Sequence, residues 1–242
     1  GQNVNAYNDD GKKLSELIYE LNEMNDLKRI RYTTSHPKDM TSDLIDAHAK
    51  CNKLMPILHL PVQSGSSKIL KLMNRRHNIS EYLEIIKKLK KINKNIKFSS
   101  DFIIGYPGED KDDFNATLDL INEIKFINSY SFIFSPRPGT VASKFKLIEK
   151  GISLERLEII QKKLFNYQIE INKSLENRII DVLVENKMDE DNKLFGRSEY
   201  MTSVIFNGNH KDIGKIVKVR INKSNQNTLF GEMIEKSNLR VA

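Results

Sequence analysis

The N-terminal part of the chain alternates between two apolar patterns, and this alternation restricts the fold more than any other feature. Apolar residues at helical spacing, over 14–24, 82–92 and 114–124, are separated by short strand-like segments such as "PILHLPVQSGS" and "IKFSSDFIIGYPGE". Strands that alternate with helices form right-handed βαβ units and a parallel sheet. We therefore expect an α/β domain with "KRIRYTTSHP" as its first strand and "SYSFIFSPRPGT" as its last, and with helices capped by Ser80 and Asp110.

Each predicted strand ends in small residues, polar residues or proline. The carboxyl ends of parallel strands line the ligand crevice, whether the sheet is open or closed into a barrel. We therefore expect four segments to meet at one mouth: Thr33–His36, Gln63–Ser66, Asp101 with Gly105–Glu109, and Ser135–Thr140.

The residue types at two of these strand ends indicate how they could contact a ligand. Gly105 and Gly108 permit the backbone to approach a ligand closely, although a tight strand-to-helix connection needs the same glycines. Pro136 and Pro138 stiffen the loop around Arg137, whose guanidinium then suits a phosphate or carboxylate. The alternative for Arg137 is a surface ion pair.

The pattern changes near residue 176. A long helix is predicted over 153–175, and five short strand-like segments follow it, separated by Gly, Asn and Asp. Strands of this kind without helices predict a small OB-like barrel, a shape that often binds oligonucleotides. The predicted domains are therefore 1–175 and 176–242.

Composition limits the partners and the kind of site. The net charge is +7, and residues 68–97 hold ten Lys and Arg against two Glu, which suits RNA or a solvated helix face. The single cysteine, Cys51, excludes a disulfide framework and a multi-cysteine metal site within these residues, and we expect it to be buried. Without an apolar membrane span or a signal segment, the chain is expected to be cytoplasmic.

Five segments occur in the order found in radical S-adenosylmethionine (SAM) methylthiotransferases, and nearly the whole chain resembles that family. The segments are "GQNVNAY", "TTSHPKDMT", "LHLPVQSGSSKILKLMNRRH", "SSDFIIGYPGE" and "FSPRPGTVAS". "LPVQSGS" together with "SPRPGT" resembles the branch that acts on N6-dimethylallyladenosine next to the tRNA anticodon. The C-terminal barrel is similar to the family's TRAM domain, which contacts RNA.

The resemblance implies the later part of a partial, TIM-like radical SAM barrel followed by TRAM. In the family, a domain with an auxiliary 4Fe-4S cluster and a Cys-x-x-x-Cys-x-x-Cys segment both precede the block that matches Gly1–Tyr7. We therefore expect Gly1 to be a cut inside a domain and this piece alone to be inactive. The full-length protein would use SAM and two 4Fe-4S clusters, an external electron donor and a tRNA substrate, as a cytoplasmic monomer.

The implied reaction starts with reductive cleavage of SAM to a 5′-deoxyadenosyl radical. This radical takes hydrogen from the prenylated adenosine, the auxiliary cluster supplies sulfur, and a second SAM supplies the methyl group. Arg137 would face the substrate as the catalytic candidate. The other residues implied are Gln2, Asn3, Ser35, Gln63, Ser64, Asp101 and Gly105 for the cofactor, and Arg75, Arg76, His77, Arg197, Lys218 and Arg220 for RNA.

Three alternatives differ in substrate or in class. The branch that acts on threonylcarbamoyladenosine shares "SPRPGT"-like loops, and the branch that modifies a ribosomal-protein aspartate fits less well because its loop is expected to lack the Arg-Pro pattern. The third alternative is a non-catalytic RNA-binding module.

The cysteine content yields a first prediction. Anaerobic reconstitution of this chain with iron and sulfide should produce no 4Fe-4S cluster, because the one thiolate of Cys51 cannot replace three. Visible absorbance after desalting measures this, with Cys51→Ser as the matched control. A stable cluster band that Cys51→Ser removes would contradict the prediction.

Overall fold

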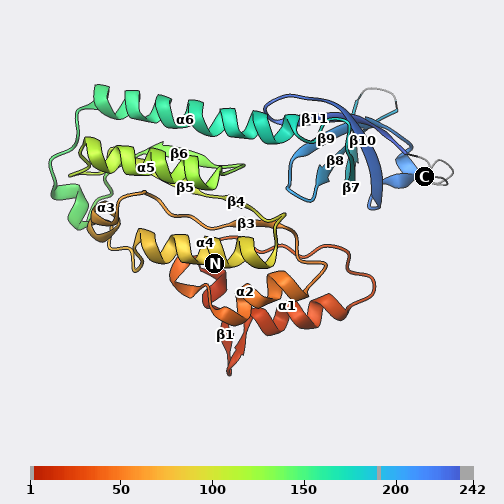
Figure 1. The fold of residues 1–242 in the computed structure, drawn as a ribbon, viewed down its shortest axis with the longest axis horizontal. Coiled ribbons are helices and arrows are strands. Elements are labelled where there is room, and N and C mark those ends of the chain that lie inside the picture. The colour runs from red at the N-terminus through yellow and green to blue at the C-terminus, as the bar shows by residue number, and fades with distance from the viewer. Residues whose placement is uncertain (1–2, 190–191, 235–242) are drawn as a thin grey trace. The chain divides into compact units, whose positions relative to one another are not determined.

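The structure is a computed structural model that describes residues 3–189 and 192–234. The chain divides into two compact units, Gly1–Leu164 and Phe165–Ala242, so the division falls inside the long helix α6 (Lys150–Lys173) (Figure 1). The domain boundary predicted near residue 176 stays a prediction.

The first unit contains the expected alternation of strands and helices. A small hairpin of β1 and β2 and the helices α1 and α2 precede the main strands, and short 3-10 turns lie at Val4–Ala6, Pro37–Asp39 and Val141–Lys144. In chain order the elements are β1 (Asn8–Asp9), β2 (Lys12–Lys13), α1 (Leu14–Glu23), α2 (Ser42–Lys50), β3 (Ile57–His59), α3 (Ser67–Leu72), α4 (Ile79–Ile92), β4 (Lys97–Ser99), β5 (Asp101–Ile104), α5 (Lys111–Ile124) and β6 (Tyr130–Ile133).

The strands of this unit pair in parallel, as predicted. β3 pairs with β4 and β5 pairs with β6, while Ser100 alone separates β4 from β5. Two parallel bridges, Ile30 with Leu54 and Gln63 with Phe102, extend the pairing on either side of β3. Consecutive strands are therefore neighbours, as in a partial parallel barrel.

The first predicted strand is wrong except at one residue. In "KRIRYTTSHP" only Ile30 makes a β-bridge, and Thr34 has a positive φ of 61°. A β-branched residue in the left-handed region turns the chain sharply, so a ladder cannot continue beyond it.

Helix capping agrees with the sequence at one helix and differs at another. Asp110 caps α5 and exchanges hydrogen bonds with Asp113, as predicted. α4 begins earlier than predicted, because Asn78 rather than Ser80 forms the capping box with Glu81. Asparagine and serine are both good caps, and the sequence pattern alone did not separate them.

The two faces of the parallel strands differ in exposure. Leu58, Phe98, Phe102 and Ile104 are at most 2% exposed and belong to the core, where Phe102 packs edge-on against Phe126. Side chains alternate across a strand, so the opposite face, which we call the open face, carries His59, Ser99, Asp101, Ile103, Tyr130 and Phe132.

The second unit is a closed five-stranded barrel, which confirms the OB-like prediction. β7 pairs with β8, β8 with β9, β9 with β11 in parallel, β11 with β10, and β10 with β7. Its core is formed by Val182, Val184, Leu194, Val204, Phe206, Val219, Ile221 and Leu229. The strands are β7 (Ile179–Lys187), β8 (Lys193–Ser198), β9 (Ser203–Asn207), β10 (Ile216–Ser224) and β11 (Thr228–Met233), with a short 3-10 turn at His210–Asp212.

The loop after β3 is fixed to α5 by close contacts around Gly65. The Gly65 amide donates to Thr117 Oγ1 at 2.9 Å, and Ser66 Oγ donates to Asp113 Oδ1 at 2.6 Å. A Cβ on Gly65 would overlap the main chain of Ala116 and Thr117. Only glycine therefore fits between this loop and α5.

Replacing Gly65 by alanine should destabilise the first unit by about 1–3 kcal/mol, the usual cost of overpacking. The matched control is Gly151→Ala, because Gly151 lies in α6 with ordinary φ, where a Cβ would make only an ordinary contact with the Glu149 side chain, and the variant should gain up to about 1 kcal/mol. Urea unfolding followed by circular dichroism measures both variants. If Gly65→Ala were as stable as the wild type, glycine would not be sterically required at this position.

Candidate functional site

Among the described residues of the first unit, two cavities share one wall. The larger, of about 1310 Å³, is lined by α3 and the loop after it, by β5 and β6, and by the segment from Ser135 to Phe145. The smaller, of about 440 Å³, is lined by Asn3, His36, Asp39 and Arg76 among others. Met73, Asn74 and Arg75 line both cavities.

Three of the four predicted strand-end segments reach these cavities. His36 lines the smaller one, whereas Tyr106, Ser135, Arg137 and Thr140 line the larger one. The segment Gln63–Ser66 lines neither, because it turns toward α5.

Arg75 belongs to the interior of the site. Its side chain is half-buried, and burial lowers the pKa of its guanidinium while the carboxylate of Asp101 acts in the opposite direction. On the open face, His59 Nε2 lies 3.6 Å from Asp101 Oδ2, and His59 Nδ1 lies 2.9 Å from Ser99 Oγ. Arg75 and Asp101 therefore bring opposite charges to one polar region.

Asn3 brings an unpaired polar atom to the smaller cavity, and a second unpaired atom belongs to Ser35, the chain neighbour of the cavity residue His36. Asn3 Nδ2 donates to Asp39 Oδ2 at 2.6 Å, and in the described part of the chain Asn3 Oδ1 and Ser35 Oγ are buried without a hydrogen-bond partner. Buried oxygens without partners are costly, so these two atoms are candidates for ligand contact. Gln2 lies outside the described residues.

Gln63 and Ser64 are adjacent and both buried, but Gln63 has a strained backbone whereas Ser64 hydrogen-bonds within its loop. Gln63 is 7% exposed and has a positive φ of 75°, a strained conformation of the kind that collects at functional sites. Ser64 is 1% exposed, and its Oγ accepts from the Ser66 amide at 3.2 Å and lies 3.5 Å from Thr117 Oγ1. Ser64 thus has a structural role in the loop, and its contact with a cofactor stays a prediction.

The turn that contains Gly105 packs against α6. The Gly105 amide donates to Glu109 Oε1 at 3.2 Å, and Arg156 Nη1 lies 2.6 Å from the same oxygen. Gly105 has a φ of 71°, and a Cβ there would press on Ser153 of α6. Burial raises the pKa of Glu109, although Arg156 acts against this rise. The sequence did not indicate Arg156, because it lies 47 residues from Glu109.

The predicted RNA-contacting residues next to the cavities have different exposures. Arg76 is exposed, whereas His77 is 7% exposed and its ring packs edge-on to His36 with centroids 5.4 Å apart. Burial, His36 and Arg75 lower the pKa of His77 to about 4, so the ring is neutral at neutral pH. A role of His77 in RNA binding stays a prediction.

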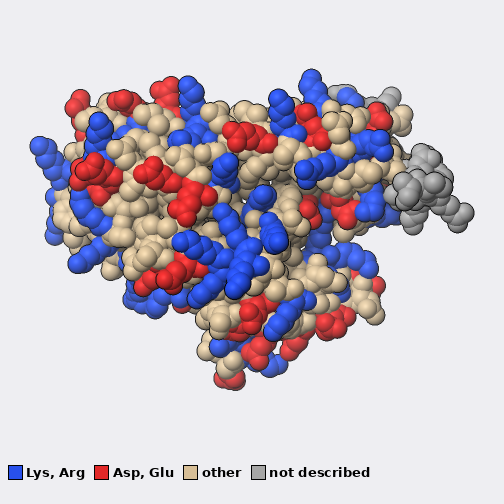
Figure 2. All heavy atoms as spheres, viewed as in Figure 1, with Lys and Arg blue, Asp and Glu red and all other residues tan. Residues whose placement is uncertain are grey.

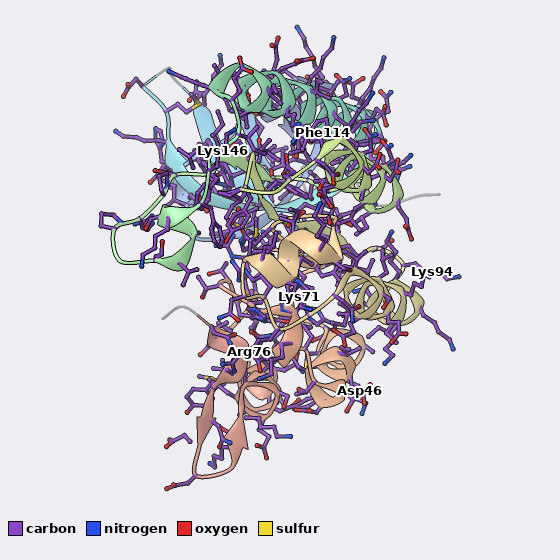
Figure 3. All side chains as sticks on the ribbon, turned by 90° about the vertical axis from the view of Figure 1, so that its left-hand side faces the viewer. Asp46, Lys71, Arg76, Lys94, Phe114 and Lys146 are labelled. Carbon is purple, nitrogen blue, oxygen red and sulfur yellow. The ribbon has the colours of Figure 1, made fainter. Side chains whose placement is uncertain are left out.

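The lysines of α4 form a separate basic surface. Figure 2 shows Lys and Arg side chains gathered over α4, where Lys87, Lys88, Lys90 and Lys91 are exposed. In Figure 3, Lys94 points away on the opposite side of the ribbon from Arg76. The basic side chains that line the cavities do not come from the C-terminal end of α4. They are Lys38, Lys68, Lys71, Arg75, Arg76 and Arg137.

The barrel residues predicted to bind RNA lie on its strands. Arg197 of β8 stacks over Phe195 at 4.9 Å and donates to Ser203 Oγ at 3.0 Å. Lys218 and Arg220 of β10 are exposed, and Lys218 Nζ lies 3.0 Å from Asp181 Oδ1. Their contact with RNA stays a prediction.

A metal centre has no ligands in the part of the chain that the structure describes. No group of three His, Cys, Asp or Glu side chains there could hold a metal ion, and Cys51 is 3% exposed. These residues do not fit an iron–sulfur cluster. In the same described residues, no helix is long and apolar enough to cross a membrane.

Comparison with known families decides the identity of the first unit. The model of the Radical SAM superfamily matches residues 1–121, which is half of the chain. The chain belongs to the radical SAM superfamily. The TRAM domain model matches residues 173–234, which include all five strands of the barrel.

The curated relatives of this radical SAM chain share one name. A tRNA-2-methylthio-N6-dimethylallyladenosine synthase of Pelagibacter ubique is 63% identical over 100% of the chain and 55% of that relative. Synthases with the same name from Orientia tsutsugamushi and Rickettsia akari are both 47% identical, over 98% and 97% of the chain and 54% of each relative. These names confirm the resemblance to the methylthiotransferases. The chain spans about half the length of the relatives it matches.

A solved structure agrees with the radical SAM fold. Coproporphyrinogen III oxidase of Escherichia coli, described as a radical SAM enzyme, superimposes with a TM-score of 0.52 at 16% identity. The match covers 91% of this chain and 55% of that one. At this identity the likeness concerns the fold alone, and it agrees with a partial parallel barrel.

The buried ion pair below the Gly105 turn gives a pH-dependent prediction. Arg156→Met should destabilise the first unit by about 3 kcal/mol at pH 7, because it leaves the Glu109 carboxylate buried without its cationic partner. Since burial already raises the pKa of Glu109 and Arg156 lowers it, the variant carboxyl should become neutral at a higher pH than in the wild type. The deficit should therefore shrink as the pH falls through that raised pKa.

Thermal unfolding between pH 4 and 8 measures this deficit. Lys91→Met, on the exposed face of α4, is the control and should show a small deficit that does not depend on pH. A constant deficit for Arg156→Met across this range would contradict the charge-based explanation.

Proposed function

We propose that this chain forms the later part of a radical SAM enzyme that methylthiolates N6-dimethylallyladenosine next to the anticodon of tRNA. The observation that carries the proposal is the 63% identity to a synthase of that name across the whole chain. The TRAM match and the basic residues around the cavities support an RNA substrate.

The smaller cavity suits the amino-acid end of SAM. Asn3 and Asp39 offer oxygens for an ammonium group, and Arg75 with Arg76 offers cationic groups for a carboxylate. The unpaired oxygen of Asn3, which lines this cavity, supports the fit. We extend the cofactor set to Arg75, which the sequence suggested only as an RNA contact, because it is half-buried and lies near Asp101.

The remaining cofactor candidates lie on β5 or in the loops that follow β3 and β5. Asp101 suits the ribose hydroxyls, and Gln63, which is strained and buried, forms a parallel bridge with Phe102. Gly105 and Ser64 support the loops rather than offer side-chain contacts. When bound, SAM supplies the radical and the methyl group, and these residues orient it and exclude water.

Arg137 is proposed to hold the substrate. It is exposed on the wall of the larger cavity, in a turn where Thr140 N and Oγ1 both donate to its carbonyl at 3.2 and 2.8 Å. A guanidinium stays charged at any working pH, so its role is electrostatic attraction of RNA phosphate or a base rather than proton transfer.

Other features of the proposed enzyme rest on the family resemblance alone. These are two 4Fe-4S clusters whose ligands this chain does not provide, an external electron donor, a monomeric state and a cytoplasmic location. No catalytic step through the clusters is derived from these residues.

A chimaera tests the function. A version of the Pelagibacter ubique synthase in which this chain replaces the matching 55% should restore 2-methylthio-N6-dimethylallyladenosine in a bacterial strain that lacks the modification. Mass spectrometry of tRNA digests measures the nucleoside. Arg137→Ala should lower the yield at least about tenfold, the order expected on losing a charged contact, whereas Lys91→Met should leave it unchanged.

The same digests separate the alternatives. A methylthiolated threonylcarbamoyladenosine without the prenylated product would indicate the other tRNA branch. A chimaera that is expressed and folded but yields neither nucleoside would favour a non-catalytic RNA-binding module.

A further inference from the structure

The open face of the sheet changes from polar to apolar along the strands. His59, Ser99 and Asp101 form its polar part. Ile103 is two residues beyond Asp101 and pairs with Phe132 in the β5–β6 ladder, and both line the larger cavity. Paired residues project from the same face of a sheet, so the apolar part adjoins the polar part without a gap.

Exposed apolar side chains continue from this ladder around the larger cavity. Phe132 is 56% exposed, Val141 is 73% exposed and Phe145 is 40% exposed. Together with Phe134 they form what we call the apolar wall. Large apolar side chains that stay exposed around a concave surface mark a binding site, because exposing them to water is unfavourable.

Two exposed aromatic rings of β6, of which Phe132 lines the larger cavity, suit a nucleobase. The rings of Tyr130 and Phe132 have centroids 6.5 Å apart and an interplanar angle of 17°. Two nearly parallel and exposed rings offer flat faces, and bases of unpaired RNA stack on such faces.

Charge and size at the larger cavity also favour RNA. Lys71 and Arg137 line it and are exposed. Lys68 Nζ forms ion pairs with Asp110 Oδ2 at 2.7 Å and Asp113 Oδ2 at 2.6 Å, so its charge is already neutralised by carboxylates. A volume of about 1310 Å³ exceeds that of typical small-ligand pockets, so a nucleotide with its neighbour fits better than a small anion.

We propose that the apolar wall binds the N6 substituent of the target adenosine and thereby selects dimethylallyl over threonylcarbamoyl. This inference rests on the proposed function, because it takes a modified adenosine in RNA as the substrate. Dimethylallyl is a branched hydrocarbon and buries well against Phe132 and Val141. Threonylcarbamoyl carries a carboxylate, whose burial against the same side chains is unfavourable.

Binding of synthetic RNA hairpins tests the inference. Three hairpins of one sequence carry dimethylallyladenosine, threonylcarbamoyladenosine or unmodified adenosine at the same loop position, and fluorescence anisotropy measures their affinities for the 242-residue chain. The wild type should prefer the dimethylallyl hairpin over each of the others by about tenfold, the effect of burying a few apolar carbons.

The variants remove apolar contact without changing charge. Val141→Asn and Phe132→Ser should each lose most of the preference, and both positions are exposed enough for the fold to tolerate the change. Leu147→Asn is the matched control, because Leu147 is 50% exposed and does not line the cavity. It should keep the wild-type preference, and thermal melting should show equal stability for all three.

The outcomes separate this inference from the proposed function. Retention of the preference by both Val141→Asn and Phe132→Ser overturns the inference alone, as does equal wild-type affinity for the three hairpins. Absence of binding to every hairpin at low salt counts against the proposed function as well. Self-association in sedimentation that Phe132→Ser abolishes would assign the apolar wall to a second copy of the chain and overturn the inference.

Discussion

The contact between the loop after β3 and α5 determines where the residues of the site lie. Gly65 fits against the main chain of Ala116 and Thr117, and Ser66 binds Asp113. Because Ser66 also caps α3, this contact sets the position of that short helix and of Arg75 just beyond it. Both cavities share this wall, so steric fit at one glycine connects the core to both proposed ligand sites.

The first unit separates polar from apolar binding chemistry within a few residues. The smaller cavity gathers Asn3, Asp39 and two arginines, whereas the larger cavity exposes aromatic and aliphatic side chains. The two cavities share Met73, Asn74 and Arg75, and Ile103 of the β5–β6 ladder lines the larger one. A cofactor and an apolar substrate group can thus be held close together while each meets surroundings of its own polarity.

Much of this arrangement was predictable from the sequence. Helical periodicity and strand-end composition predicted the parallel α/β unit, the cap Asp110 and the strand ends that reach the cavities, because each depends on neighbouring residues. The strand at "KRIRYTTSHP" and the cap at Ser80 were wrong, because Thr34 and Asn78 adopt conformations that periodicity does not encode. Arg156 was missed because its partner Glu109 is remote in the sequence.

The sequence by itself determined the order of strands and helices, the closed C-terminal barrel and the family resemblance, because these follow from local apolar patterns and ordered motifs. Only the tertiary structure decided which of the strand-end residues face a cavity. In the structure Ser64 hydrogen-bonds within its loop, and His77 is buried. Arg75 lies near Asp101, and Phe132 lies beside Ile103. The reason is that these environments depend on packing between segments distant in the chain, which no local pattern records.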